Sequence, residues 1–221
     1  MAQLHVLRVF TDERGEHGNL LGVFLDGSQV SRTERQAVAA ELGFSETVFV
    51  DDAERGEIQI FTPAAEIPFA GHPVVGTAWL LAEARRPVDV LRPPPGEVMV
   101  RRQGPVTFAS AKAEWSPDFD YTEHPDAAAV ESLDPADTRG DNFNWAWIDE
   151  GAGKIRARGF YPGWGIAEDE ATGSAVLALA VALHRPIEVR QGVGSLIRAR
   201  PLGGGRGEIG GTVSMFERRS Y

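Results

Sequence analysis

Short apolar runs separated by turn-forming residues dominate the pattern of this chain. The first runs, each rich in β-branched and aromatic side chains as is typical of strands, are residues 4–10, 20–25, 47–50 and 57–61. Similar runs follow at 97–101, 105–109, 143–148, 194–200 and 207–216. The residues at 149–153 and the glycines at 203–205 have the composition of hairpin turns, so antiparallel pairing is expected.

One segment, 31–42, has the amphipathic spacing of a surface helix. Ser31 is a candidate N-cap, and Glu34 stands three residues further on, which is the spacing of a capping box. Gly43 is a natural C-terminal stop. We therefore expect a helix that begins at Ser31 and ends before Gly43.

Two other segments, 74–84 and 175–183, are apolar nearly all round, which predicts helices that are buried on most sides. Each follows a strand that ends in an aromatic residue and proline, and then a polar loop that contains glycine. This weak repeat predicts an α+β fold of two similar lobes. In each lobe, a mainly antiparallel, barrel-like sheet would curl around one central helix.

The length of 221 residues fits one large domain or two small ones with a real core. We expect the N-terminal lobe to span residues 1–108 and a shortened C-terminal lobe to span residues 109–206. The last strand, at about 207–221, is expected to return to the first lobe.

Composition narrows the class of protein. A net charge of −10 and a pI of about 5.0 argue against nucleic acid or an anionic membrane as the main partner, since both call for basic patches. The first ten residues lack the apolar stretch of a signal peptide, and the apolar segment 175–183 is far too short to span a bilayer. We expect a soluble, cytoplasmic protein. The histidines show no ligand spacing, so we predict no metal.

Glu46 gives the strongest chemical signal, because it stands directly before the apolar run 47–50. An ionised carboxylate is costly to bury unpaired, and a closed apolar cleft would raise its pKa toward working pH. Two polar segments, one around His72 and one around Asp169, lead into the buried helices. Helix N-termini carry unpaired N–H donors that suit a carboxylate. The pattern predicts an acid/base site with two helix ends aimed at an anionic substrate.

These segments resemble the PhzF-like family of phenazine-biosynthesis isomerases, which shares the diaminopimelate epimerase fold. The matching motifs run nearly end to end, in the order Val9-Phe10-Thr11, Gly18-Asn19, Ser45-Glu46-Thr47, Ile60-Phe61-Thr62-Pro63, Gly71-His72-Pro73, Glu168-Asp169, Ala171-Thr172-Gly173-Ser174-Ala175, Gln191-Gly192 and Gly210-Gly211. Each motif alone is weak, but their shared order is specific. The resemblance implies a homodimeric isomerase of secondary metabolism that needs no cofactor.

The resemblance also implies a role for each matching residue. Glu46 would be the general acid/base that moves a proton between carbons of one substrate, His72 would assist proton handling, and Asp169 would orient the substrate. The small carboxylate substrate would be bound by Gly71, Gly173, Ser174, Thr172 and Asn19. Other interpretations stay open, because His72 would also fit as a packing histidine, and Thr172 and Ser174 as helix N-caps.

The absence of cysteine decides between reaction types. Epimerases of the same fold use two cysteines, whereas this chain has none and carries Ala70 before Gly71. Racemisation by two thiols is therefore excluded, and the predicted reaction is a double-bond isomerisation with Glu46 as the one base. Two alternatives remain. One is a racemase or epimerase that pairs Glu46 with His72 or Asp169, and the other is a non-catalytic protein that binds a metabolite or a partner.

The chain departs from the family pattern in three places. Leu20 and Glu170 each stand where the family usually has proline, and the second lobe is shorter between about residues 90 and 155. A shortened lobe would reshape the cleft. It puts the dihydro-hydroxyanthranilate substrate of the namesake enzyme in doubt.

Overall fold

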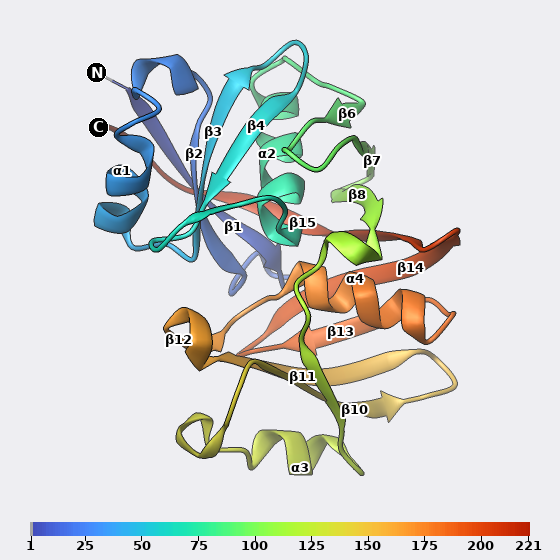
Figure 1. Cartoon of the computed structure of the whole chain (residues 1–221). Helices are drawn as coiled ribbons and strands as arrows, with labels where there is room; N and C mark the ends of the chain where they lie inside the picture. The colour runs from blue at the N-terminus through green and yellow to red at the C-terminus, as the bar shows by residue number, and fades with distance from the viewer. Residues whose placement is uncertain (1) are drawn as a thin grey trace.

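A computed structural model describes residues 2–221, and its strands form one hydrogen-bonded sheet (Figure 1). The strands are β1 (Gln3–Thr11), β2 (Asn19–Phe24), β3 (Glu46–Asp52), β4 (Glu57–Phe61), β5 (Glu66–Ile67), β6 (Val90–Leu91), β7 (Val98–Gln103), β8 (Val106–Lys112), β9 (Asp120–Glu123), β10 (Asn142–Asp149), β11 (Lys154–Tyr161), β12 (Ile166–Asp169), β13 (Ile187–Gln191), β14 (Ser195–Gly203) and β15 (Arg206–Ser220). The helices are α1 (Arg35–Leu42), α2 (Gly71–Glu83), α3 (Ala127–Glu131) and α4 (Gly173–Ala182). Short 3-10 turns lie at Gly27–Gln29, Ala113–Trp115, Pro135–Asp137 and Pro162–Trp164.

The long strand β15 connects the two halves of the sheet. Its first half pairs with β14 on one side and β8 on the other, and its second half pairs with β1, where Gln3 lies opposite Ser220. From β1 the sheet continues through β2, β3, β4 and β5, and from β14 through β13, β11, β10 and β9. Most neighbours are antiparallel, while β2–β3, β9–β10 and β11–β13 are parallel. The division of the chain into lobes at residue 108 stays a prediction.

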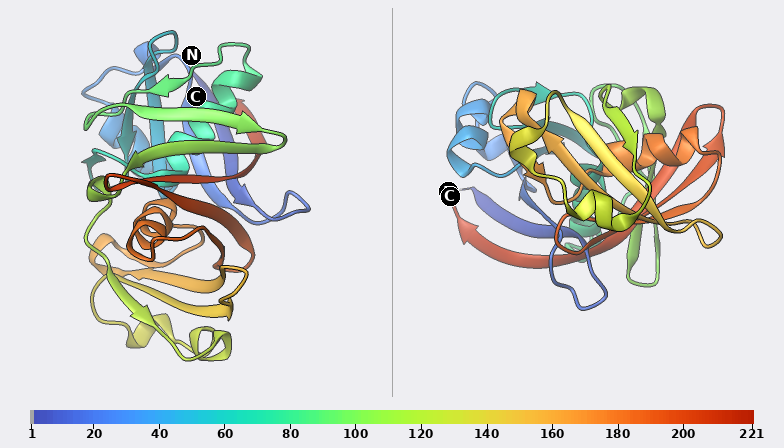
Figure 2. Two further views of the ribbon diagram at one scale, coloured as in Figure 1. Left: turned by 90° about the vertical axis from the view of Figure 1, so that its right-hand side faces the viewer. Right: turned by 90° about the horizontal axis from the view of Figure 1, so that it is seen from below.

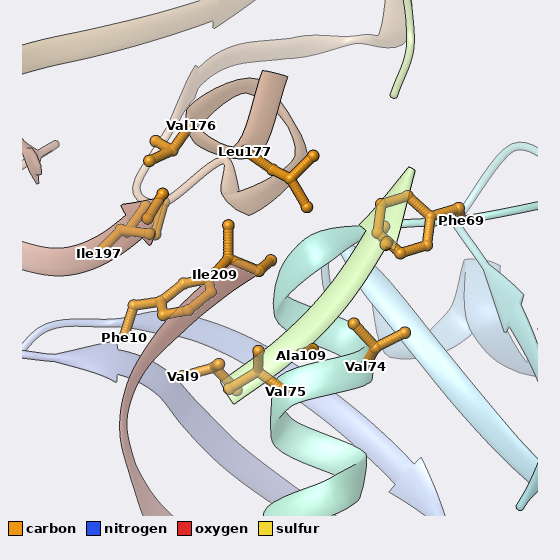
Figure 3. Close-up of a cluster of buried hydrophobic side chains, with 14 of the residues drawn as sticks. Val9, Phe10, Phe69, Val74, Val75, Ala109, Val176, Leu177, Ile197 and Ile209 are labelled. Atoms are coloured by element: carbon orange, nitrogen blue, oxygen red, sulfur yellow. The ribbon is translucent and has the colours of Figure 1, made fainter. Parts of the chain in front are cut away.

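Two buried helices lie against different parts of this sheet (Figure 2). Helix α2 packs on β1, β2, β3, β8 and β15, and helix α4 packs on β14 and β15. Apolar side chains from both helices and from the strands between them form the core, including Phe10, Val75, Leu177 and Ile209 (Figure 3). A strand-rich α+β fold of the predicted class is thus observed, with both predicted buried helices in place.

For the helix predicted at 31–42, the predicted C-terminal end is confirmed and the predicted start is wrong. It begins at Arg35, because the Ser31 hydroxyl donates to the Glu34 side chain at 2.6 Å and caps no backbone N–H. The buried Arg35 side chain anchors the first turn through an ion pair with Asp51 at 2.7 Å. Gly43 ends the helix as predicted, in the left-handed conformation at φ 67°.

No helix among residues 2–221 is long and apolar enough to cross a membrane.

Candidate active site

The predicted site residues come together although they are far apart in the sequence. Glu46 begins β3, Asp169 ends β12, and the first turns of α2 and α4 complete the wall. One pocket is lined by seven of the eight predicted residues, namely Glu46, Gly71, His72, Asp169, Thr172, Gly173 and Ser174. The eighth, Asn19, does not line this pocket but donates a hydrogen bond to Asp169, which does.

Glu46 and His72 form a close pair of buried groups. Glu46 Oε2 lies 3.1 Å from His72 Nε2, yet their orientation makes no hydrogen bond, and neither atom has a hydrogen-bond partner within residues 2–221. Burial raises the pKa of Glu46 to about 8, with the charge of Asp169 as a second cause. Burial also lowers the pKa of His72 to about 3. Near neutral pH the pair is therefore mainly a neutral acid beside a neutral imidazole, despite the ion-pair distance.

Asp169 is as deeply buried as Glu46, but both of its carboxylate oxygens accept hydrogen bonds. Asn19 Nδ2 donates to Oδ1 at 2.6 Å, and the Thr172 hydroxyl donates to Oδ2 at 2.7 Å. Burial raises the pKa of Asp169 above its ordinary value, and these two hydrogen bonds act in the opposite direction. The carboxylate is therefore fixed in one orientation.

Three residues to which the sequence analysis assigned no role in the site complete this network. Gln191 Nε2 donates to the Thr172 hydroxyl at 2.8 Å, and the Tyr161 hydroxyl donates to the same oxygen at 3.0 Å. On the other side, the Ser45 hydroxyl donates to Asn19 Oδ1 at 3.1 Å. For Gln191 the signal was the Gln191-Gly192 motif, but nothing in the sequence gave its hydrogen-bond partner.

The two helix N-termini meet at glycines. A Cβ on Gly71 would lie 2.6 Å from the carbonyl carbon of Gly173, so the two backbones touch. Side chains at either position would separate the helices. The first-turn N–H groups of α2 and α4 consequently converge on one pocket, where their dipoles favour negative charge.

Aromatic side chains close the pocket. They are Phe69, Phe119, Tyr161 and Trp164, and they leave a free volume of about 20 Å³, room for about one solvent molecule. A groove of about 890 Å³ lies directly outside, and it shares Ser45, Ile67, Trp164, Ile166 and Asp169 with the pocket. A ligand of ring size therefore requires this shared wall to move.

Solved structures of a PhzC/PhzF-type protein and of an epimerase share this strand-rich fold. A solved phenazine biosynthesis PhzC/PhzF-type protein from Clostridium difficile superposes with a TM-score of 0.80 at 18% identity, covering 100% of this chain and 99% of that one. A hydroxyproline epimerase from Agrobacterium vitis superposes with a TM-score of 0.65 at 12% identity, covering 99% and 91%. Both likenesses concern the fold alone.

Sequence comparison gives the particular family. The profile of the phenazine biosynthesis-like protein family matches residues 7–133, more than half of the chain. A trans-2,3-dihydro-3-hydroxyanthranilate isomerase from Pseudomonas chlororaphis is 32% identical, over 80% of this chain and 81% of that relative. The chain belongs to the PhzC/PhzF family, and the prediction that it is an isomerase is confirmed at that level.

Proposed function

We propose that this protein moves one proton between two carbons of a small unsaturated carboxylate, with Glu46 as the single acid/base and without a cofactor. The observation that carries the proposal is the state of Glu46, a buried carboxyl group with a pKa of about 8, 3.1 Å from a neutral imidazole. General acid/base groups work best when their pKa lies near the working pH. Glu46 meets that condition. Asp169, by contrast, is held in one orientation by the hydrogen bonds that it accepts.

The proton transfer has two steps. Ionised Glu46 takes a proton from carbon, and the electron pair left behind shifts the double bond by one position. Protonated Glu46 then returns the proton to the carbon at the other end. With a pKa of about 8, about a tenth of Glu46 is ionised at pH 7 in the empty site. His72 lies close enough to bond the carboxyl group as it changes charge.

The rest of the pocket supports binding of an anion. The first-turn N–H groups at Gly173 and Ser174 suit the substrate carboxylate, and Asp169 is placed to accept a hydrogen bond from a polar group of the same molecule. The aromatic wall favours a planar or cyclic carbon skeleton. A homodimer, implied by the family resemblance, is part of this proposal, and light scattering would measure it.

Turnover in deuterium oxide tests the reaction type. The first compound to use is trans-2,3-dihydro-3-hydroxyanthranilate, followed by other cyclic unsaturated acids, with proton NMR as the readout. We expect the double bond to migrate, with at most one solvent deuteron in the product. An epimerase that pairs Glu46 with His72 or Asp169 would instead invert one carbon and label it without moving a double bond, and this result would overturn the proposal.

A further inference from the structure

Glu170, at the edge of the site, accepts four hydrogen bonds from one loop. It follows Asp169 directly, and its carboxylate accepts from the backbone N–H groups of Val193, Gly194 and Ser195 at 2.8, 3.2 and 3.3 Å. It also accepts from the Ser195 hydroxyl at 2.7 Å. One side chain thereby holds the whole loop between β13 and β14.

The β13–β14 loop is connected to the predicted site by hydrogen bonds. The Ser195 hydroxyl, fully buried, accepts a hydrogen bond from the Gly18 N–H at 3.0 Å. Gly18 precedes Asn19, whose side chain donates to Asp169. Glu170, Ser195, Gly18, Asn19 and Asp169 therefore form a closed circuit of covalent and hydrogen bonds. Because the β1–β2 loop and the β13–β14 loop are far apart in the sequence, this circuit fixes two distant segments relative to each other.

The Glu170 carboxylate lies close against the backbone of Gly192. A Cβ on Gly192 would lie 2.2 Å from Glu170 Oε2, and Gly192 has φ 56°, so this position requires glycine. Arg156 holds the same loop from its other side, donating to the Gly192 carbonyl at 2.7 Å. The Glu170 carboxylate on the loop amides and the Arg156 guanidinium on the loop carbonyl thus restrain the loop at several backbone groups.

We propose that Glu170 is a positioning residue of the acid/base site, which keeps Asn19 bonded to Asp169 and thus Asp169 fixed beside Glu46. The inference rests on the function proposed above for Glu46 and Asp169. Glu170 itself touches no reacting atom. Its contribution is to hold, through Ser195 and Gly18, the amide that orients the Asp169 carboxylate.

The direct test is hydrogen exchange of the Asn19 side-chain amide, followed by NMR in the ligand-free protein. In the parent protein the amide is buried and bonded, so exchange is slow. In Ser195→Ala, which removes no charge, and in Glu170→Gln, we expect exchange at least about tenfold faster. The double variant should be no faster than the faster single variant, because both substitutions break the same path.

A second readout is the pH titration of the Glu46 carboxyl group. The Glu46 carboxyl carbon is observed in protein labelled with 13C-glutamate and identified by its loss in Glu46→Gln. The titratable groups around it are His72 on α2, Asp169 on β12 and Tyr161 on β11. We expect the Glu46 midpoint to fall by about half a pH unit or more in Ser195→Ala, because a loosened Asp169 admits water.

Glu168→Gln is the matched control. Glu168 lies two residues from Glu170, carries the same charge and bonds Arg158 at 2.7 and 2.8 Å instead of the loop. It should leave both readouts unchanged. If Ser195→Ala and Glu170→Gln lower the melting temperature but leave Asn19 exchange at the parent rate, Glu170 only stabilises a loop and the inference is wrong. A Glu46 midpoint near 4.5 in the parent protein would instead overturn the proposed function, while Asn19 exchange would still decide the role of Glu170.

Discussion

Two carboxylates in one pocket are buried to the same depth but differ in their hydrogen bonding. Glu46 and Asp169 are each 9% exposed. Asp169 accepts a short hydrogen bond on each oxygen, whereas Glu46 Oε2 has no hydrogen-bond partner within residues 2–221. Burial alone therefore does not decide what a carboxylate does. The hydrogen bonds around it also shift its pKa and fix its orientation.

The difference in hydrogen bonding arises because different strands and helices surround the two carboxylates. Asp169 lies between β2, the start of α4 and the end of β13, and each of these offers a donor or a supporting polar group. Glu46 lies at the start of β3 and faces α2, whose only polar side chain in the pocket is the His72 ring. In the proposed mechanism, the Asp169 side of the pocket orients the substrate and the Glu46 side transfers the proton.

The largest effect is expected from removing the mobile proton. Glu46→Gln keeps the size and hydrogen-bonding capacity of the side chain but cannot take up a proton, so turnover should fall about 10³-fold. Circular dichroism should show an unchanged fold. Glu66→Gln is the control, since Glu66 is exposed and bonds Gln59 outside the pocket. Full activity in Glu46→Gln would remove the distinction between the two carboxylates.

The raised pKa of Glu46 predicts how stability depends on pH. The folded protein binds this proton up to pH of about 8, while the unfolded chain releases it near 4.5. The free energy of unfolding should therefore fall as pH rises from 4.5 to 8, by at most about 1.4 kcal/mol per pH unit, and level off above. Urea unfolding of the parent protein and Glu46→Gln, compared across this range, measures the slope. Equal slopes would mean that Glu46 titrates normally.

Asp169→Asn tests the orienting side. The substitution puts an amide N–H₂ opposite the donors Asn19 Nδ2 or Thr172 Oγ1, so one buried donor loses its acceptor. We expect about 1–3 kcal/mol of lost stability and a loss of turnover smaller than in Glu46→Gln. Thermal unfolding and steady-state rates give both values. Unchanged stability would show that the network around Asp169 is not needed for the fold.

The smallest effect is expected at the edge of the network. Tyr161→Phe removes one hydroxyl that donates to Thr172 Oγ1, while Gln191 still donates to the same oxygen. Stability should fall by about 1 kcal/mol. A fall as large as in Asp169→Asn would show that Tyr161 belongs to the central part of the network.

Much of the fold was predictable from local pattern. The apolar helices at α2 and α4 and most strands have a periodicity that is independent of partners, so their existence and type followed from the sequence. The start of α1 did not, because Ser31 and Glu34 bond each other instead of capping the backbone. Strand β5 was also missed, since its two residues form a strand only by pairing with β4.

The sequence by itself determined the family, the class of reaction that the lack of cysteine excludes, and the segments that carry the site. These depend on residue identity and order, which a sequence contains in full. Only the tertiary structure decided that the helix ends touch at Gly71 and Gly173, that Asp169 is bonded on both oxygens, and that Glu170 holds the β13–β14 loop. Burial and hydrogen bonding depend on neighbours distant in the chain, and the contrast between Glu46 and Asp169 arises from those neighbours.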